Sequence, residues 1–253
     1  MTSSPPESST SDDVILVKVV EEEWVEIPVP DVSHLVTEDD TPVDNLLSEK
    51  QQRLLINSLY SSLLSDEPFL AAANVGLYYA VKQPAIVPDV LLSLGVSVPE
   101  DWSQKQNRSY FVWQFGKPPE VVIEIVSNTV GNELGSKLED YAQARVAYYV
   151  VFDPLRCLDG PVLRVYELHA TRYRLLNDNW MEHIELGVTL WEGTFEEKQY
   201  NWLRWCDRAG NLLLTGDERA EVERRRADAE HQRAERLAQL LRSRGIDPDQ
   251  VLE

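Results

Sequence analysis

The sequence predicts a mixed α/β fold in which helices flank one central sheet and a charged helix follows at the C-terminus. Three observations indicate this class. Leucines recur at helical spacing from about residue 45, short apolar runs typical of strands follow between residues 74 and 154, and a segment of helical character separates the last two runs. Because a helix between two buried strands covers one face of their sheet, the pattern favours helices packed on a single sheet.

The composition limits the class of protein. The chain has 253 residues, 43% of them apolar, which is enough for one sizeable core. A formal charge of −19 disfavours proteins that hold nucleic acid through bulk positive charge, so phosphate chemistry would need a local site. The chain lacks a run of about 18 apolar residues, the features of a secretion signal, and CxxC spacing of its two cysteines. We therefore expect a soluble, cytoplasmic protein with no membrane span, disulfide framework or zinc site.

Charge and composition divide the chain into an acidic arm (1–44), a folded domain (45–215) and a charged helical tail (216–253). Residues 1–48 contain 12 acidic residues and one basic residue, Lys18. Residues 1–13 are rich in Ser, Thr, Pro and Asp, a composition typical of disorder. Residues 14–30 have strand character and would form either an extra edge strand or a loosely attached arm.

The tail is predicted to be one helix over 218–245. Small or apolar residues fall seven apart at Ala220, Ala227, Ala234 and Leu241. Two of the companion positions are Glu223 and Glu230, which weakens a coiled-coil seam. A solvated charged helix and a weak coiled coil both stay open, and the first is favoured.

The elements of the folded domain follow from periodicity. Leucine spacing predicts a helix over 45–64. Strands are expected over 74–82, 88–94, 109–115, 119–128 and 147–154, with a helix over 138–145 and a hairpin over 163–176. Four tryptophans between residues 180 and 205 indicate packing in the core or in a dimer.

Glu124 lies inside the expected strand over 119–128. Five of the six residues around and including it, from Val121 to Val126, are β-branched aliphatics, which indicates a strand buried on both faces. A carboxylate in such a strand is costly unless a metal ion, a basic partner or protonation neutralises it. Glu124 is therefore a candidate functional residue.

Asp89 and Lys137 are the other candidates. Asp89 follows Pro88 at the start of a strand, where turn chemistry alone would explain it. Paired with Glu124, it would supply two oxygen donors, which suits Mg²⁺. Lys137 shares a helix face with Tyr141 and could bring its ammonium near these carboxylates, although a solvated lysine explains it equally well.

Basic and aromatic residues interleave between positions 105 and 117, at Lys105, Arg108, Tyr110, Phe111, Trp113, Phe115 and Lys117. This mixture could contact phosphates and bases. Aromatic side chains that pack inward beside solvated cations explain the same residues, and we favour this second interpretation.

The order Pro88-Asp89, Glu124, Lys137 resembles the PD-(D/E)XK restriction-endonuclease-like superfamily. More narrowly, the runs VPDVLL, RSYFVWQFGKPPEVVIEIVSN and LGSKLEDYAQARVAYYVVFDP are similar to its Uma-type endonuclease family. The resemblance implies a central mixed sheet flanked by helices, with Asp89, Glu124 and the Ile125 carbonyl binding Mg²⁺ or Mn²⁺. The superfamily lysine usually stands two residues after the acid, where this chain has Val126; in the Uma-type pattern it comes from the next helix, and Lys137 matches it.

Two features of the resemblance are less regular. The turn after the strand reads SNTVGN and departs from the family pattern, which leaves loop conformation and substrate contacts open. An acid from an upstream helix sometimes joins the site, and Glu49 is a candidate that we do not favour.

The resemblance implies a Mg²⁺-dependent endonuclease that hydrolyses phosphodiester bonds in nucleic acid, with DNA as the expected substrate. Asp89 and Glu124 would bind the metal, and Lys137 would orient the attacking water. A catalytically silent nuclease-fold protein that binds partners through its charged C-terminal helix is the alternative, and a nucleic-acid-binding module without turnover is a third. A homodimer through the sheet edge or the tail stays open.

Overall fold

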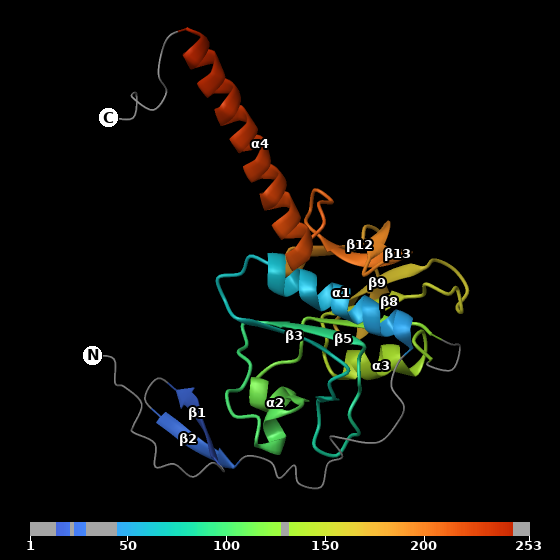
Figure 1. Ribbon diagram of the computed structural model, residues 1–253. Coiled ribbons are helices and arrows are strands. Elements are labelled where there is room, and N and C mark those ends of the chain that lie inside the picture. The colour runs from blue at the N-terminus through green and yellow to red at the C-terminus, as the bar shows by residue number, and fades with distance from the viewer. Residues whose placement is uncertain (1–13, 21–22, 29–44, 128–131, 245–253) are drawn as a thin grey trace.

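A computed structural model of the protein describes residues 14–20, 23–28, 45–127 and 132–244 (Figure 1). Its centre is a six-stranded mixed sheet with the strand order β10-β9-β8-β7-β5-β3. The strands are β3 (Phe69–Ala73), β5 (Val90–Leu94), β7 (Val121–Ile125), β8 (Tyr148–Phe152), β9 (Leu163–His169) and β10 (Arg172–Leu175). Within this sheet only β7 and β8 pair in parallel, and the helix between them supplies the crossover. The predicted fold class is therefore confirmed.

Each face of the central sheet is covered by a different layer. Helix α1 (Leu46–Ser62) packs Leu55 and Leu59 on one face, against Ile123 and other buried side chains of the sheet. Helix α3 (Ser136–Gln143) packs Tyr141 on the opposite face, against a second cluster that contains Val122. Side chains of β7 alternate between these two clusters, which is why nearly every residue of that strand is apolar.

The tryptophan-rich segment forms a second, three-stranded sheet. Its strands are β11 (Trp180–Met181), β12 (Leu186–Phe195) and β13 (Lys198–Cys206), all antiparallel. Trp202 and Trp205 are fully buried, and the indole of Trp205 donates a hydrogen bond to the Leu55 carbonyl of α1. Core packing thus accounts for two of these tryptophans, and this sheet shares the α1 side of the central sheet.

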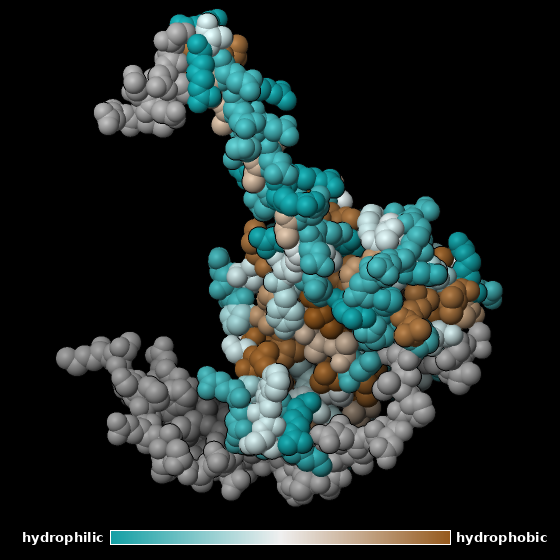
Figure 2. Space-filling view, viewed as in Figure 1, coloured by the Kyte–Doolittle hydropathy of each residue, from teal (hydrophilic) through white to brown (hydrophobic). Residues whose placement is uncertain are grey.

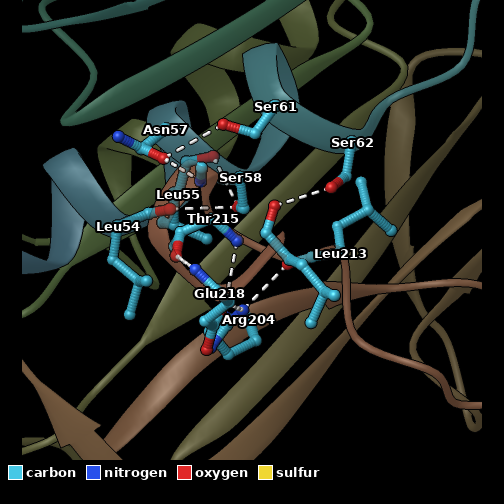
Figure 3. Close-up of polar contacts among 12 residues, drawn as sticks. Leu54, Leu55, Asn57, Ser58, Ser61, Ser62, Arg204, Leu213, Thr215 and Glu218 are labelled. Atoms are coloured by element: carbon cyan, nitrogen blue, oxygen red, sulfur yellow. Dashed lines mark hydrogen bonds and ion pairs between the residues drawn. The ribbon is translucent and has the colours of Figure 1, made fainter. Parts of the chain in front are cut away.

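The C-terminal helix α4 (Gly216–Ser243) is joined to the body at its first turn (Figure 3). Thr215 and Glu218 form a capping box, which satisfies backbone N–H groups at the helix start. The fully buried Arg204 of β13 donates to both carboxylate oxygens of Glu218. Beyond this anchor the helix projects away from the body (Figure 1), and hydrophilic side chains cover most of it in Figure 2.

Several predicted elements are confirmed. The helix expected over 45–64 is α1, the strand over 88–94 is β5, the strand over 119–128 is β7 and the strand over 147–154 is β8. The helix over 138–145 is α3, the hairpin is β9–β10, and the tail helix is α4.

Two expected strands are largely wrong. The run over 74–82 contains only β4 (Leu77–Tyr78), and the real strand β3 ends just before it, where Asn74 adopts a left-handed backbone with φ 54°. The run over 109–115 contains only β6 (Tyr110–Phe111) and then turns into the short helix α2 (Val112–Phe115). Strands β4 and β6 pair in parallel as a separate two-stranded sheet.

The N-terminal strand-like run forms β1 (Val14–Val20) and β2 (Glu23–Pro28), which pair with each other in a sheet of their own. The run is therefore not an extra edge strand of the central sheet. The segment over 1–13, for which we expect disorder, lies outside the described residues. Among the helices that the structure describes, none is both long enough and apolar enough to cross a membrane.

Candidate active site

The strand register brings two of the predicted site residues together. Val90 of β5 lies opposite Ile123 of β7, so one further step along this antiparallel pair places Asp89 opposite Glu124. Both carboxylates are buried, with 9% of Asp89 and 3% of Glu124 exposed. The chain therefore holds two acids side by side at one end of its central strands.

The third predicted residue, Lys137, reaches the same place from α3. Its ammonium lies 2.8 Å from Oε2 of Glu124, and the hydroxyl of Tyr141 donates to Oε1 of the same carboxylate at 2.5 Å. Lys137 and Tyr141 stand one helical turn apart, so both side chains project from one face of α3 onto β7. The lysine is thus directed at the acids rather than into bulk solvent.

Burial and neighbouring charges act in opposite directions on these groups. The pKa of Glu124 is raised to about 7, because burial and the charge of Asp89 raise it by more than the nearby Lys137 lowers it. Burial lowers the pKa of Lys137, but the attraction of Glu124, Glu133 and Asp89 outweighs burial and raises it. Burial, and then the negative charge of Glu124, raise the pKa of Tyr141, so its phenol stays neutral and donates. The site therefore retains a protonated amine beside an easily protonated acid.

Asp89 is held by groups from both sides of the site. Its Oδ2 accepts a hydrogen bond of 2.5 Å from the Ile125 backbone N–H, and its Oδ1 accepts one of 3.0 Å from the Gln52 side chain. Gln52 also exchanges hydrogen bonds with the Asn74 side chain, at 3.2 and 3.3 Å. Asp89 thus has a fixed orientation, which a simple turn residue would not need.

Helix α1 contributes Gln52 to the site rather than Glu49. Glu49 is half-exposed and forms an ion pair with Arg53 on the outer side of α1. Gln52 is buried on the inner side, next to the apolar residues that face the sheet. A buried glutamine within a leucine-rich helix face was the signal available in the sequence, and we missed it.

Glu133 is a second residue that sequence reasoning missed. It is 5% exposed, and its Oε1 lies 3.6 Å from the Lys137 ammonium. Its Oε2 is buried and has no hydrogen-bond partner among the residues that the structure describes. It lies in the turn before α3, outside any helix, and the sequence signals it only as an acid close to Lys137.

The donor set fits a hard divalent cation. Asp89 and Glu124 present two buried carboxylates, of which Glu124 is held by the Lys137 ammonium. Mg²⁺ binds oxygen and usually takes only one or two carboxylates in a protein. Within the described part of the chain, no three His, Cys, Asp or Glu side chains converge as a metal cage. A two-carboxylate Mg²⁺ or Mn²⁺ site is therefore compatible with these residues.

The basic and aromatic residues over 105–117 do not add to this cluster. Tyr110 and Phe111 are buried, and Arg108 donates to the backbone carbonyls of Trp102 and Ser103. Lys117 donates to the Leu94 carbonyl and forms an ion pair with Glu120. These contacts support the interpretation in which the aromatic groups pack inward and the cations have local structural partners.

The comparisons with known proteins concern the same part of the chain. The family Uma2, described as "Putative restriction endonuclease", matches residues 37–194, a range that includes Asp89, Glu124 and Lys137. Among solved structures, the chain is similar to a protein of Anabaena variabilis ATCC 29413 described as "a putative nuclease belonging to DUF820". That match has 14% sequence identity and a TM-score of 0.36 and covers 63% of this chain and 75% of the other. No curated protein matches the chain.

The family match extends over more than half of the 253 residues, and β13 and α4 lie beyond its C-terminal limit. It agrees with the resemblance that the runs around Asp89, Glu124 and Lys137 suggest. The chain therefore belongs to the Uma2 family, whose description is "Putative restriction endonuclease".

Proposed function

We propose that the protein is a Mg²⁺-dependent endonuclease, also active with Mn²⁺, that hydrolyses phosphodiester bonds in DNA. The observation that carries this proposal is the convergence of Asp89, Glu124 and Lys137 in one buried cluster, with the ammonium 2.8 Å from Glu124. Two carboxylates and one amine at this spacing are suited to holding a divalent cation beside a reacting phosphate.

Asp89 and Glu124 would hold the cation, with the Ile125 carbonyl as a third oxygen donor. Asp89 is fixed by the Ile125 N–H and by Gln52, so its carboxylate needs little reorientation to bind. A bound Mg²⁺ would act as a Lewis acid and neutralise charge on the scissile phosphate. Tyr141 holds the other oxygen of Glu124 and thereby fixes the plane of that carboxylate.

Lys137 would orient the attacking water and stabilise negative charge that develops on the phosphate. Its ammonium is held at the site by Glu124. A fixed cationic donor next to the reacting phosphate lowers the barrier because little reorganisation is needed during the reaction.

The net charge agrees with a substrate that binds locally. At a formal charge of −19 the protein would gain little from long-range attraction to DNA. Binding would then depend on the cation, on Lys137 and on contacts near the site, and it would strengthen markedly when the divalent cation is present. DNA is proposed over RNA because the family description is that of a restriction endonuclease.

A plasmid-nicking assay tests this function. The wild type should convert supercoiled plasmid into nicked or linear DNA in Mg²⁺ or Mn²⁺, and EDTA should stop the reaction. A triple variant with Asp89→Ala, Glu124→Gln and Lys137→Ala should be inactive. Equal cleavage by both proteins would indicate a contaminating nuclease, and an inactive wild type that binds no divalent cation would reject the proposal.

A catalytically silent nuclease-fold protein is the second candidate. The observation that favours it is α4, which has no buried residue along its 28 residues and so leaves a long charged surface available. Under this alternative, deletion of 222–253 would abolish partner binding, and the triple variant would behave as the wild type in every assay. Cleavage by the wild type that the triple variant lacks would exclude it.

A further inference from the structure

Glu133 is a buried acid for which neither catalysis nor folding gives an immediate reason. It lies just before α3, and one of its oxygens is buried without a hydrogen-bond partner among the described residues. Burial of a carboxylate oxygen without a partner is costly, and such groups are few in native proteins. Stability alone therefore does not account for an acid at this position.

The backbone of Glu133 is fixed, so its side chain stays directed at the site. The hydroxyl of Tyr149, which is fully buried in the central strand β8, donates to the Glu133 carbonyl at 3.0 Å. From this position Oε1 lies 3.6 Å from the Lys137 ammonium, on which Glu124 makes the shorter contact of 2.8 Å. Lys137 thus stands between two carboxylates, one from β7 and one from the segment that leads into α3.

A divalent cation would change the balance between these two carboxylates. Oε2 of Glu124 is the atom that holds Lys137, and it is also one of the oxygens available to a cation. A cation there would compete for this oxygen and repel the ammonium. The lysine stem is long and flexible, so without a second partner the amine would move toward solvent.

We propose that Glu133 is a positioning residue, which keeps the Lys137 ammonium at the reaction site when a divalent cation occupies Glu124. This role rests on the proposed nuclease function. The Lys137 ammonium lies 2.8 Å from Glu124 and 3.6 Å from Glu133. A small rotation of the lysine side chain would therefore bring the ammonium within hydrogen-bond distance of Glu133. The oxygen of Glu133 without a partner provides further acceptor capacity for the ammonium, which carries three donors.

Two substitutions at Glu133 and one control test this role. Glu133→Gln keeps the size and removes the charge, and Glu133→Asp keeps the charge on a shorter stem. Glu139→Gln, on the exposed side of the same helix, is the matched control. Thermal unfolding would identify any variant that fails to fold, and Glu133→Asp keeps the test valid if Glu133→Gln does not fold.

The first readout is independent of cleavage. Calorimetry with Mg²⁺ alone should give the same affinity for the wild type, Glu133→Gln and the control. Amine labelling followed by mass spectrometry should show that saturating Mg²⁺ leaves the labelling of Lys137 nearly unchanged in the wild type and raises it several-fold in Glu133→Gln. Exposed Lys198 serves as the internal reference, because its labelling should not respond to Mg²⁺.

The second readout is steady-state cleavage of plasmid. Glu133→Gln should lower kcat about tenfold or more with little change in KM, because the substrate still binds while the amine is displaced. Glu133→Asp should recover part of this loss. In a Lys137→Ala background, Glu133→Gln should cause no further loss, since its effect passes through the lysine.

The outcomes separate this role from the function itself. A loss of Mg²⁺ affinity of about 10- to 100-fold in Glu133→Gln, the size typical of residues that build a metal site, would assign Glu133 to the cation site and overturn the positioning role. The positioning role would also be overturned if Glu133→Gln showed the same labelling of Lys137 and the same kcat as the wild type. Absence of both Mg²⁺ binding and cleavage in the wild type would instead reject the proposed nuclease.

Discussion

The guanidinium of Arg204 and the carboxylate of Glu218 form a two-point ion pair, with N–O distances of 3.0 and 2.7 Å, that joins β13 to the first turn of α4 (Figure 3). Arg204 is fully buried and also donates to the Leu213 carbonyl, while its guanidinium lies over the Trp191 ring. The same Glu218 oxygen that accepts from Arg204 accepts the Thr215 N–H of the capping box. One acidic side chain thus satisfies both the helix start and a buried cation.

Removal of Glu218 should destabilise the protein well beyond the loss of a helix cap. Glu218→Ala would leave the Arg204 charge buried without its partner, at a cost of about 3 kcal/mol; this is the low end for a broken buried pair, because Glu218 is one third exposed. Denaturant unfolding of the full chain measures this cost. Glu223→Gln, five residues further along the exposed helix, is the control and should unfold like the wild type. A Glu218→Ala variant of wild-type stability would contradict the anchor.

Glu124 should make the stability of the metal-free protein fall as pH rises. Its pKa is about 7 in the folded state against 4.5 for the free side chain, so between these values the folded state binds more protons than the unfolded state. The contribution of this proton to stability is therefore fully present below pH 4.5 and is lost progressively as the pH rises to 7. Over this range Glu124→Gln should gain about 3 kcal/mol in stability relative to the wild type, the equivalent of a shift of about 2.5 pKa units.

Urea unfolding at a series of pH values between 4 and 8 checks this prediction. Glu139→Gln removes an exposed carboxylate from α3 and should leave the pH dependence of the wild type unchanged. Parallel pH profiles for the wild type and Glu124→Gln would show that burial does not perturb this acid.

The predicted site residues were accessible to sequence reasoning because each leaves a local signal. Glu124 is a single acid in an apolar strand, and Lys137 and Tyr141 stand at helical spacing. For Glu133 the only signal in the sequence is its closeness to Lys137. For Gln52 the only signal is its place in a leucine-rich helix. Their roles depend on burial and on contacts across the fold, which no local pattern contains.

The sheet β11–β13 shows why part of the fold was missed. Strands β12 and β13 pair from Gly187–Cys206 to Phe195–Lys198, so Glu196 and Glu197 alone form the turn. Both have positive φ, 45° and 64°, where hairpin turns usually carry Asn or Gly. Two glutamates give no turn signal, so the hairpin between two of the longest strands could not be recognised from its sequence.

Gln52 should support cation binding although it would not bind the cation itself. It fixes Oδ1 of Asp89 through a 3.0 Å hydrogen bond, and removal of a residue that orients a metal ligand typically costs about 10- to 100-fold in affinity. We expect Gln52→Ala to weaken Mg²⁺ binding by this amount in calorimetry. Arg53→Ala, the adjacent and exposed position on α1, should bind as the wild type does. Equal affinities for the two variants would mean that Asp89 is oriented without Gln52.

Lys137 should separate catalysis from cation binding. Lys137→Ala removes the ammonium next to Glu124 but leaves Asp89 and both oxygens of Glu124 in place, so the divalent cation should bind as tightly as in the wild type or more tightly. Cleavage should fall about 100- to 1,000-fold, the loss typical of removing one charge-stabilising donor from an active site. Calorimetry with Mg²⁺ and plasmid cleavage measure the two effects on the same preparations.

Lys198→Ala is the matched control, because it removes an exposed lysine from β13 on the other sheet and should change neither quantity. The ammonium and the cation both neutralise the charge of Glu124. Loss of the ammonium therefore leaves a buried negative charge that the cation can neutralise. A Lys137→Ala protein that binds Mg²⁺ and still cleaves plasmid at the wild-type rate would exclude the lysine from the reaction. A variant that loses Mg²⁺ binding while remaining folded would instead make the lysine part of the cation site.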